Sequence, residues 1–145
     1  MKLLITVCFV WGAVGCAAAP RLVLPDAHGG HQTDVDALLA AAPLPAGENI
    51  RALLLERTET SSYHLVQVRN RERPHVHAAH DLSMTLLRGE GALYIGGVAH
   101  QVRPGDVAVI RRGTAHYFVN AADTPAIAFV TFSPPYDGTD QVPAE

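Results

Sequence analysis

Short segments rich in β-branched and other apolar residues recur along most of the chain, with Gly or Pro between them. Gly96-Gly97 can form the centre of a tight hairpin turn, and Pro104-Gly105 suits a type II turn. This spacing predicts strands at 50–57, 63–69, 82–88, 92–95, 98–102, 107–111, 117–120 and 126–132. The pattern indicates an all-β sandwich or barrel and excludes alternating strands and helices.

One short helix is expected near the start of this β region. Thr33 or Asp34 can cap a helix that ends at Ala42. The length of 145 residues suits one domain, which we place at 33–145. Residues 17–32 are rich in Ala, Pro, Gly and His, and this composition predicts a flexible tether before the domain.

The N-terminal segment 1–16 has the features of an export signal. Lys2 is basic, and residues 3–14 form an apolar stretch that is shorter than the roughly 20 residues of a membrane-spanning helix. The sequence Ala-Val-Gly-Cys that ends at Cys16 resembles a bacterial lipobox, which implies cleavage before Cys16 and its lipidation. The alternatives are plain secretion with cleavage near 17–19 and a buried N-terminal strand or helix.

Charge and cysteine content exclude several classes of function. The net charge is -3, and no basic cluster is present to neutralise nucleic-acid phosphates. Arg71 and Arg73, with Glu72 between them, are typical of a solvated surface. The two cysteines, Cys8 and Cys16, both fall in the export segment, so the domain is expected to lack disulfides and free thiols.

The strongest chemical signal is a pair of histidines two residues apart, His75 and His77. Pro74 favours extended backbone before it, so a strand can begin at this point. On a strand, His75 and His77 point to one face while Val76 points to the other. Two imidazoles on one strand face can chelate one metal ion.

Residues 50–135 resemble the cupin superfamily, and the first of its two motifs is G-x5-H-x-H-x3,4-E-x6-G. His75, His77 and Gly89 occupy the two histidine positions and the closing glycine of this motif. The resemblance implies a cupin jelly-roll β-barrel, with the two histidines as metal ligands in the barrel mouth.

The second cupin motif, G-x5-P-x-G-x2-H-x3-N, is matched at four positions. Gly105, Gly113, His116 and Asn120 lie at the family's spacing, while Arg111 stands in place of the proline. The core motifs therefore span 73–120. The resemblance implies that His116 is the third metal ligand and that Asn120 and the glycines, Gly89 included, are structural.

The fourth ligand is where the sequence departs from the family. Counting back from Gly89, the family's glutamate position is Leu82, which cannot bind a metal. Asp81 matches the shorter spacing from His77, and His80 is a second candidate. A third alternative is an open or water-filled position. A carboxylate ligand suits Fe, Mn or Ni, whereas three histidines and water suit zinc.

Two classes of function fit these residues, because cupins include both enzymes and binding proteins. We expect an exported, lipid-anchored cupin of the cell envelope that binds one divalent metal ion: Fe, Mn, Ni or Zn. The alternatives are a metal-dependent oxygenase or isomerase acting on a small polar molecule, and a metal-free ligand-binding barrel. A soluble periplasmic or secreted protein is the alternative location. The resemblance also implies a homodimer, and no nucleic-acid partner is expected.

Overall fold

The structure, a computed structural model, describes residues 20–26 and 28–144. Its elements are β1 (Arg21–Leu24), β2 (His31–Asp34), α1 (Val35–Ala41), β3 (Ile50–Arg57), β4 (Ser62–Val68), β5 (His75–His77), β6 (Asp81–Arg88), β7 (Gly91–Ile95), β8 (Val98–Val102), β9 (Val107–Ile110), β10 (His116–Asn120), β11 (Ala126–Ser133) and β12 (Gln141–Pro143). The export segment 1–16 and Cys16 lie outside the described residues. Among the described residues, no helix is long and apolar enough to cross a membrane.

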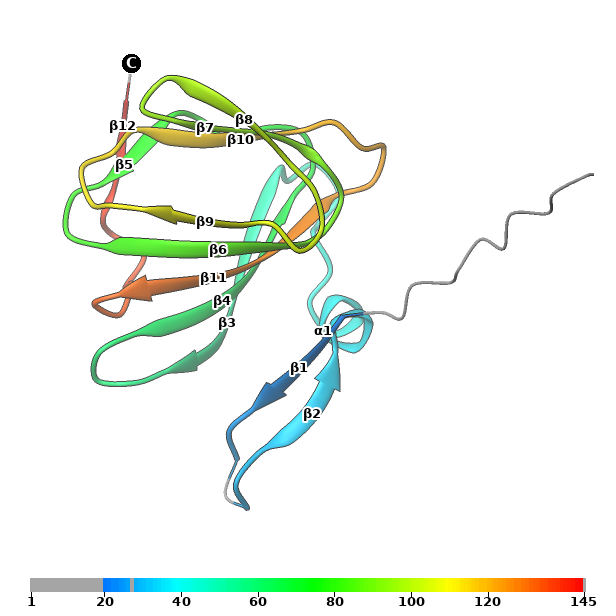
Figure 1. The fold of residues 1–145 in the computed structure, drawn as a ribbon. Helices are drawn as coiled ribbons and strands as arrows, with labels where there is room; N and C mark the ends of the chain where they lie inside the picture. The colour runs from blue at the N-terminus through cyan, green and yellow to red at the C-terminus, as the bar shows by residue number, and fades with distance from the viewer. Residues whose placement is uncertain (1–19, 27, 145) are drawn as a thin grey trace, which may run out of the picture.

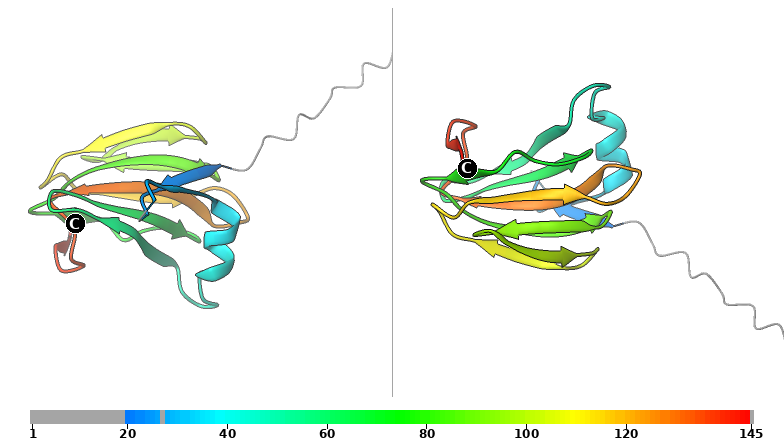
Figure 2. Two further views of the ribbon diagram at one scale, coloured as in Figure 1. Left: turned by 90° about the horizontal axis from the view of Figure 1, so that it is seen from below. Right: turned by 90° about the horizontal axis from the view of Figure 1, so that it is seen from above.

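Two antiparallel sheets of five strands face each other and form the barrel (Figures 1 and 2). One sheet has the order β12-β5-β10-β7-β8, and the other has the order β3-β4-β11-β6-β9. Non-consecutive strands are neighbours in both sheets, as in a jelly roll. The expected fold class, an all-β cupin barrel with one short helix, is confirmed.

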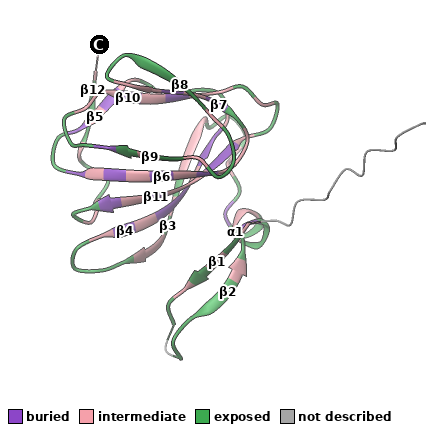
Figure 3. Ribbon diagram, in the orientation of Figure 1, coloured by how far each residue is buried: buried purple, intermediate pink, exposed green. Residues whose placement is uncertain are grey.

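Alternating side chains place the core between the two sheets (Figure 3). On β6, Leu82, Met84 and Leu86 are buried, while the residues between them are more exposed. Because side chains of a strand alternate between its faces, β6 presents one apolar face to the interior. Burial of each such side chain contributes about 1.5–3 kcal/mol to stability.

The helix α1 covers one end of the barrel (Figure 2). Asp34 is its N-cap, and its carboxylate accepts a hydrogen bond of 2.7 Å from the Ala37 N–H. Val35 is fully buried and packs with Leu65 and Ile127 from the sheet. The predicted cap and helix are therefore confirmed, with the last helical residue one position before Ala42.

The described residues of the expected tether 17–32, which are 20–26 and 28–32, contain regular structure. β1 and β2 pair as an antiparallel hairpin that extends away from the barrel (Figure 1). Leu22 packs against the cluster around Val35, so part of the hairpin is anchored to the domain. The alternation of Leu22 and Leu24 with more exposed neighbours is the strand signal that the composition of this segment obscures.

The eight predicted strands are all present, with ends that differ by at most one residue. The turn at Gly96-Gly97 has positive φ angles of 57° and 83°, as a tight hairpin requires. Gly89 is needed for a different reason, because a Cβ at this position would lie 2.9 Å from the Ala126 Cα. The additional strand β12 pairs with β5, and it brings the C-terminal segment beside the histidine pair.

Candidate metal centre

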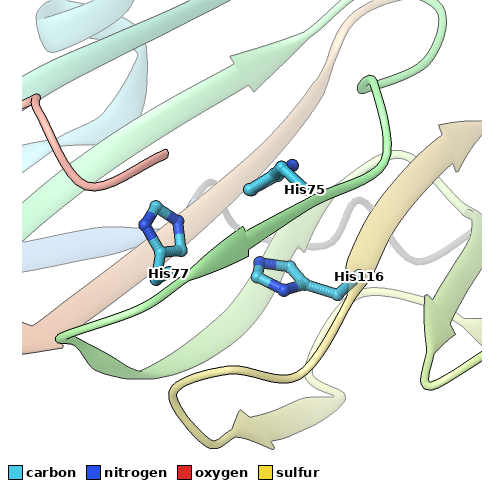
Figure 4. Close-up of side chains that lie close together, drawn as sticks. All are labelled: His75, His77 and His116. Carbon is cyan, nitrogen blue, oxygen red and sulfur yellow. The ribbon is translucent and has the colours of Figure 1, made fainter. Parts of the chain in front are cut away.

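Three histidines from two neighbouring strands point into the barrel (Figure 4). His75 and His77 share one face of β5, and His116 lies directly opposite His75 on β10. Each of the three is only 5% exposed. The ring centroids are 4.4 Å apart for His75 and His116, 5.1 Å for His75 and His77, and 5.5 Å for His77 and His116. The structure therefore brings the three predicted histidines together.

Backbone carbonyls fix the tautomer of each ring. The Nδ1 atoms hydrogen-bond to backbone oxygens in the pairs His75–Arg73 (2.8 Å), His77–Asp140 (2.9 Å) and His116–Thr114 (2.9 Å). A carbonyl oxygen can only accept, so each Nδ1 must carry the proton. Each Nε2 then has a free lone pair, which is the arrangement that metal-binding histidines use. One ligand atom from each ring lies within 4.8 Å of the other two.

Burial also keeps two of these rings neutral. It lowers the pKa of His116 to about 4, although the hydrogen bond to the Thr114 carbonyl opposes the shift. Burial is likewise the main cause that lowers the pKa of His77, followed by the proximity of His75. Neutral imidazole is the form that binds a metal, so protons compete weakly for these ligands near neutral pH.

The histidines line a cavity of about 90 Å³ between the sheets. The sheet that holds β4, β6, β9 and β11 contributes only apolar side chains: Val66, Val68, Leu82, Met84, Leu86, Ile110, Ala126, Ala128, Val130 and Phe132. The polar lining residues come from β5, from β10 and from the segment before β5. A cavity of this size has room for several waters or for one small organic molecule.

Comparison with known proteins identifies the family. The family model described as "Cupin domain" matches residues 63–132. A curated protein of Aquifex aeolicus (strain VF5), named only as an uncharacterized protein, is 39% identical over 98 residues, covering 68% of this chain and 80% of that protein. The chain belongs to the cupin family. The cupin resemblance of the two motifs is thus confirmed at the level of the family.

A second curated protein and two solved structures are also similar to this cupin. An L-ectoine synthase of Aliivibrio fischeri (strain MJ11) is 27% identical over 95 residues, which cover 64% of this chain and 74% of the synthase. The protein TT1209 from Thermus thermophilus has a TM-score of 0.60 and 24% identity, over 68% of this chain and 95% of that one. KdgF from Halomonas sp. has a TM-score of 0.57 and 24% identity, over 61% of this chain and 82% of that one. The two solved structures support the fold alone.

Asp81, a predicted fourth ligand, is not brought to the three histidines of this cupin. Its carboxylate faces outward and accepts from the Arg112 backbone N–H at 2.9 Å and from the Arg112 guanidinium at 2.7 Å. These hydrogen bonds lower the pKa of Asp81 to about 2. The neighbouring Leu82 is buried and lines the cavity, as strand alternation requires. An apolar side chain therefore occupies the family's glutamate position.

His80, the alternative fourth ligand, is bound elsewhere. Its Nδ1 lies 2.6 Å from a carboxylate oxygen of Asp140, and its ring centroid is 6.4 Å from that of His77. The Asp140 carboxylate also accepts the backbone N–H groups of Ala78 and Ala79, at 3.0 and 2.8 Å. Asp140 thus holds the loop after β5 with its side chain and orients His77 with its carbonyl. Sequence reasoning missed it, because it lies about sixty positions away.

Glu72 is the second residue that sequence reasoning missed, and its expected place on the solvated surface needs correction. It lines the cavity with the three histidines. Its carboxylate Oε2 accepts the Phe118 backbone N–H at 2.8 Å. The flanking Arg71 and Arg73 are exposed, as expected. Regular strand alternation from His75 would point Glu72 outward, so the local sequence carries no signal for its position in the cavity.

The motif residues outside the metal centre hold turns. Asn120 donates from Nδ2 to the Arg69 and Thr124 carbonyls, each at 2.8 Å, and accepts the Ala122 N–H at 3.2 Å. Gly105 and Gly113 have positive φ angles of 95° and 75°. Gly113 also donates its N–H to the His77 carbonyl at 2.8 Å, which ties the turn before β10 to β5.

Proposed function

We propose that this cupin binds one divalent metal ion through the Nε2 atoms of His75, His77 and His116. The observation that carries the proposal is the set of three backbone carbonyls on the Nδ1 atoms. They commit each ring to one tautomer and leave three buried lone pairs on one side of the cavity. Preorganised, neutral imidazoles are the ligands expected of Zn, Fe, Mn or Ni sites.

The remaining positions on the ion are proposed to be open to water or to a small ligand. The apolar side of the cavity, where Leu82 lies, offers no ligand atom, and the carboxylate of Asp81 is turned toward Arg112. Three histidines with an open position resemble catalytic zinc sites more than closed structural ones. Such an ion, when bound, acidifies a coordinated water or polarises a ligand oxygen.

A metal-dependent enzyme acting on a small polar molecule is the second candidate. Two observations favour it: relatives at 24–27% identity carry the name L-ectoine synthase, and the cavity holds a carboxylate beside the histidines. The name describes those proteins, and their substrate is not transferred to this chain.

We also propose that the protein is exported and anchored through a lipid on Cys16. The support is the lipobox-like sequence that ends at this residue. Replacement Cys16→Ser is expected to move the protein from the membrane fraction to the soluble fraction. Unchanged fractionation would contradict the anchor without touching the metal proposal.

The metal proposal is tested by the metal content of the purified domain and by competition with a coloured chelator. We expect about one equivalent in the parent and a loss of at least about a hundredfold in affinity for His75→Ala, which removes one of three ligands. His100→Ala is the matched control, because His100 is exposed on β8. Equal metal affinity in the parent and in both variants would overturn the proposal.

A further inference from the structure

Glu72 enters the cavity because the chain carries one extra residue before β5. His75 pairs with His116, whereas Arg71 forms a bridge with Val119. Arg71 and His75 are four residues apart, whereas the residues that they pair with on β10 are three residues apart. This offset is the geometry of a β-bulge. Within the bulge, the Glu72 N–H donates to the Phe118 carbonyl and the Glu72 Oε2 accepts the Phe118 N–H, both at 2.8 Å. The first contact fixes the backbone of Glu72 against β10, and the second fixes its carboxyl group there.

The carboxyl group of Glu72 forms no ion pair among the residues that the structure describes. Burial accordingly raises the pKa of Glu72, while the proximity of His75 opposes the rise. A buried carboxylate is costly unless it is paired or hydrogen-bonded. An ion on the three histidines that line the same cavity would supply the missing positive charge.

One carboxylate oxygen remains available to a ligand. Oε2 is committed to Phe118, and Oε1 has no hydrogen-bond partner in the part of the chain that the structure describes. No Glu72 oxygen belongs to the group of ligand atoms that lie within 4.8 Å of one another. Glu72 therefore lines the cavity beside the three histidines without belonging to their ligand group, and it is placed to contact what the ion binds.

We infer that Glu72 is a specificity-determining residue that accepts a hydrogen bond from a small O–H or N–H ligand held at the open metal position. This inference rests on the proposed metal site and names its ligand class. The opposite wall is apolar, so the rest of the ligand is small and uncharged. An anionic ligand without a proton to donate is disfavoured, because it meets the carboxylate charge.

The test uses Co²⁺ bound to the domain, with imidazole and azide as probes followed by visible absorption at pH 8. Imidazole binds a metal through one nitrogen and can offer the N–H of the other to Glu72. Azide is an anion with no proton to donate. Glu72→Gln is the matched variant, because the amide oxygen can still accept the Phe118 N–H while the amide nitrogen becomes a donor.

The two probes should respond in opposite directions. In Glu72→Gln we expect imidazole to bind about tenfold more weakly and azide about tenfold more tightly than in the parent. A residue that only supports Phe118 would change neither constant. The inference is overturned if the binding constants of imidazole and azide are the same in Glu72→Gln and the parent, or if both change in the same direction. In that case, Co²⁺ uptake by the parent still supports the metal site. No Co²⁺ uptake by the parent overturns both.

A second measurement does not depend on the variant folding. In a crystal structure of the parent with Co²⁺ and imidazole, Glu72 Oε1 should lie about 2.7–3.2 Å from the uncoordinated imidazole nitrogen. An imidazole that points this nitrogen away from Glu72 contradicts the inference even if the variant cannot be made.

Discussion

The two walls of the cavity differ in the chemistry that they offer. One wall, built by β5, β10 and the bulge before β5, presents three histidines and one carboxyl group. The facing wall, built by β4, β6, β9 and β11, presents only apolar side chains. An ion in this cupin can therefore be held from one side only. The difference teaches that, without the family's glutamate, a bound ion would keep an open side at Leu82 in place of a fourth protein ligand.

The largest expected effect comes from a carboxylate on the apolar wall. Leu82→Glu places an acid at the family's glutamate position, where the present side chain is buried. Without metal, we expect the free energy of unfolding to fall by about 3–5 kcal/mol, because an unpaired charge is buried. With metal, the carboxylate can bind the ion, and much of this loss should be recovered.

Urea unfolding with and without added metal measures this effect. Leu82→Gln is the control, since it has the size of the acid but no charge. If metal stabilises the Glu and Gln variants equally, the new side chain does not reach the ion and the open side lies elsewhere.

The next effect is a pH dependence of the free energy of unfolding, which arises from the wall of the cavity that holds the histidines. His116 has a pKa of about 4 in the folded state and about 6.5 when unfolded, so the unfolded chain binds the proton first as the pH falls. The stability of the metal-free protein is therefore full above pH 6.5 and falls by up to about 3 kcal/mol towards pH 4. Urea unfolding between pH 4 and pH 6.5, with a chelator present to keep the protein metal-free, measures this loss of stability. His116→Gln should flatten the curve, and an unchanged curve would show that His116 is not buried as a neutral ring.

A smaller effect is expected where the C-terminal segment supports the histidine wall. Asp140→Ala keeps the backbone carbonyl on His77 but removes the carboxylate that holds His80 and the loop after β5. We expect metal affinity to fall about tenfold, because residues that orient a ligand typically contribute 10–100-fold. Chelator competition measures this loss. His80→Gln, which spares the contacts of Asp140 with the backbone, should retain more affinity, and the reverse order would contradict this role.

The smallest effect is expected outside the cavity. Asp81 pairs with Arg112 on the surface, where both side chains are about half exposed. Asp81→Asn should therefore leave metal affinity unchanged and shift the melting temperature by no more than about 2 °C. Equilibrium dialysis with the metal compares the variant with the parent. A marked loss of metal would show that Asp81 turns inward when the ion binds.

Local patterns predicted much of the fold. Alternating apolar residues located the strands of both sheets, and the capping pattern located α1 at Asp34. β12 was missed because it has three residues and includes Pro143, so it carries almost no local signal. β1 and β2 were missed because Ala, Pro, Gly and His dominate the composition of segment 17–32.

The candidate site was predictable only where its geometry follows from spacing. His75 and His77 share a face because they are two residues apart, and the second motif supplied His116. Glu72 was missed because its inward direction depends on a one-residue bulge. Asp140 was missed because its contacts arise only when the C-terminal segment returns to β5. Such placements depend on tertiary structure and leave little trace in local sequence.

The most direct test of the metal centre is a crystal structure of the metal-loaded domain with the ion located by anomalous scattering. We predict one strong peak, about 2.0–2.2 Å from the Nε2 atoms of His75, His77 and His116, with a non-protein ligand on the side of Leu82. A peak bound by Asp81 or His80 instead, or no peak among the three histidines at saturating metal, would contradict the account.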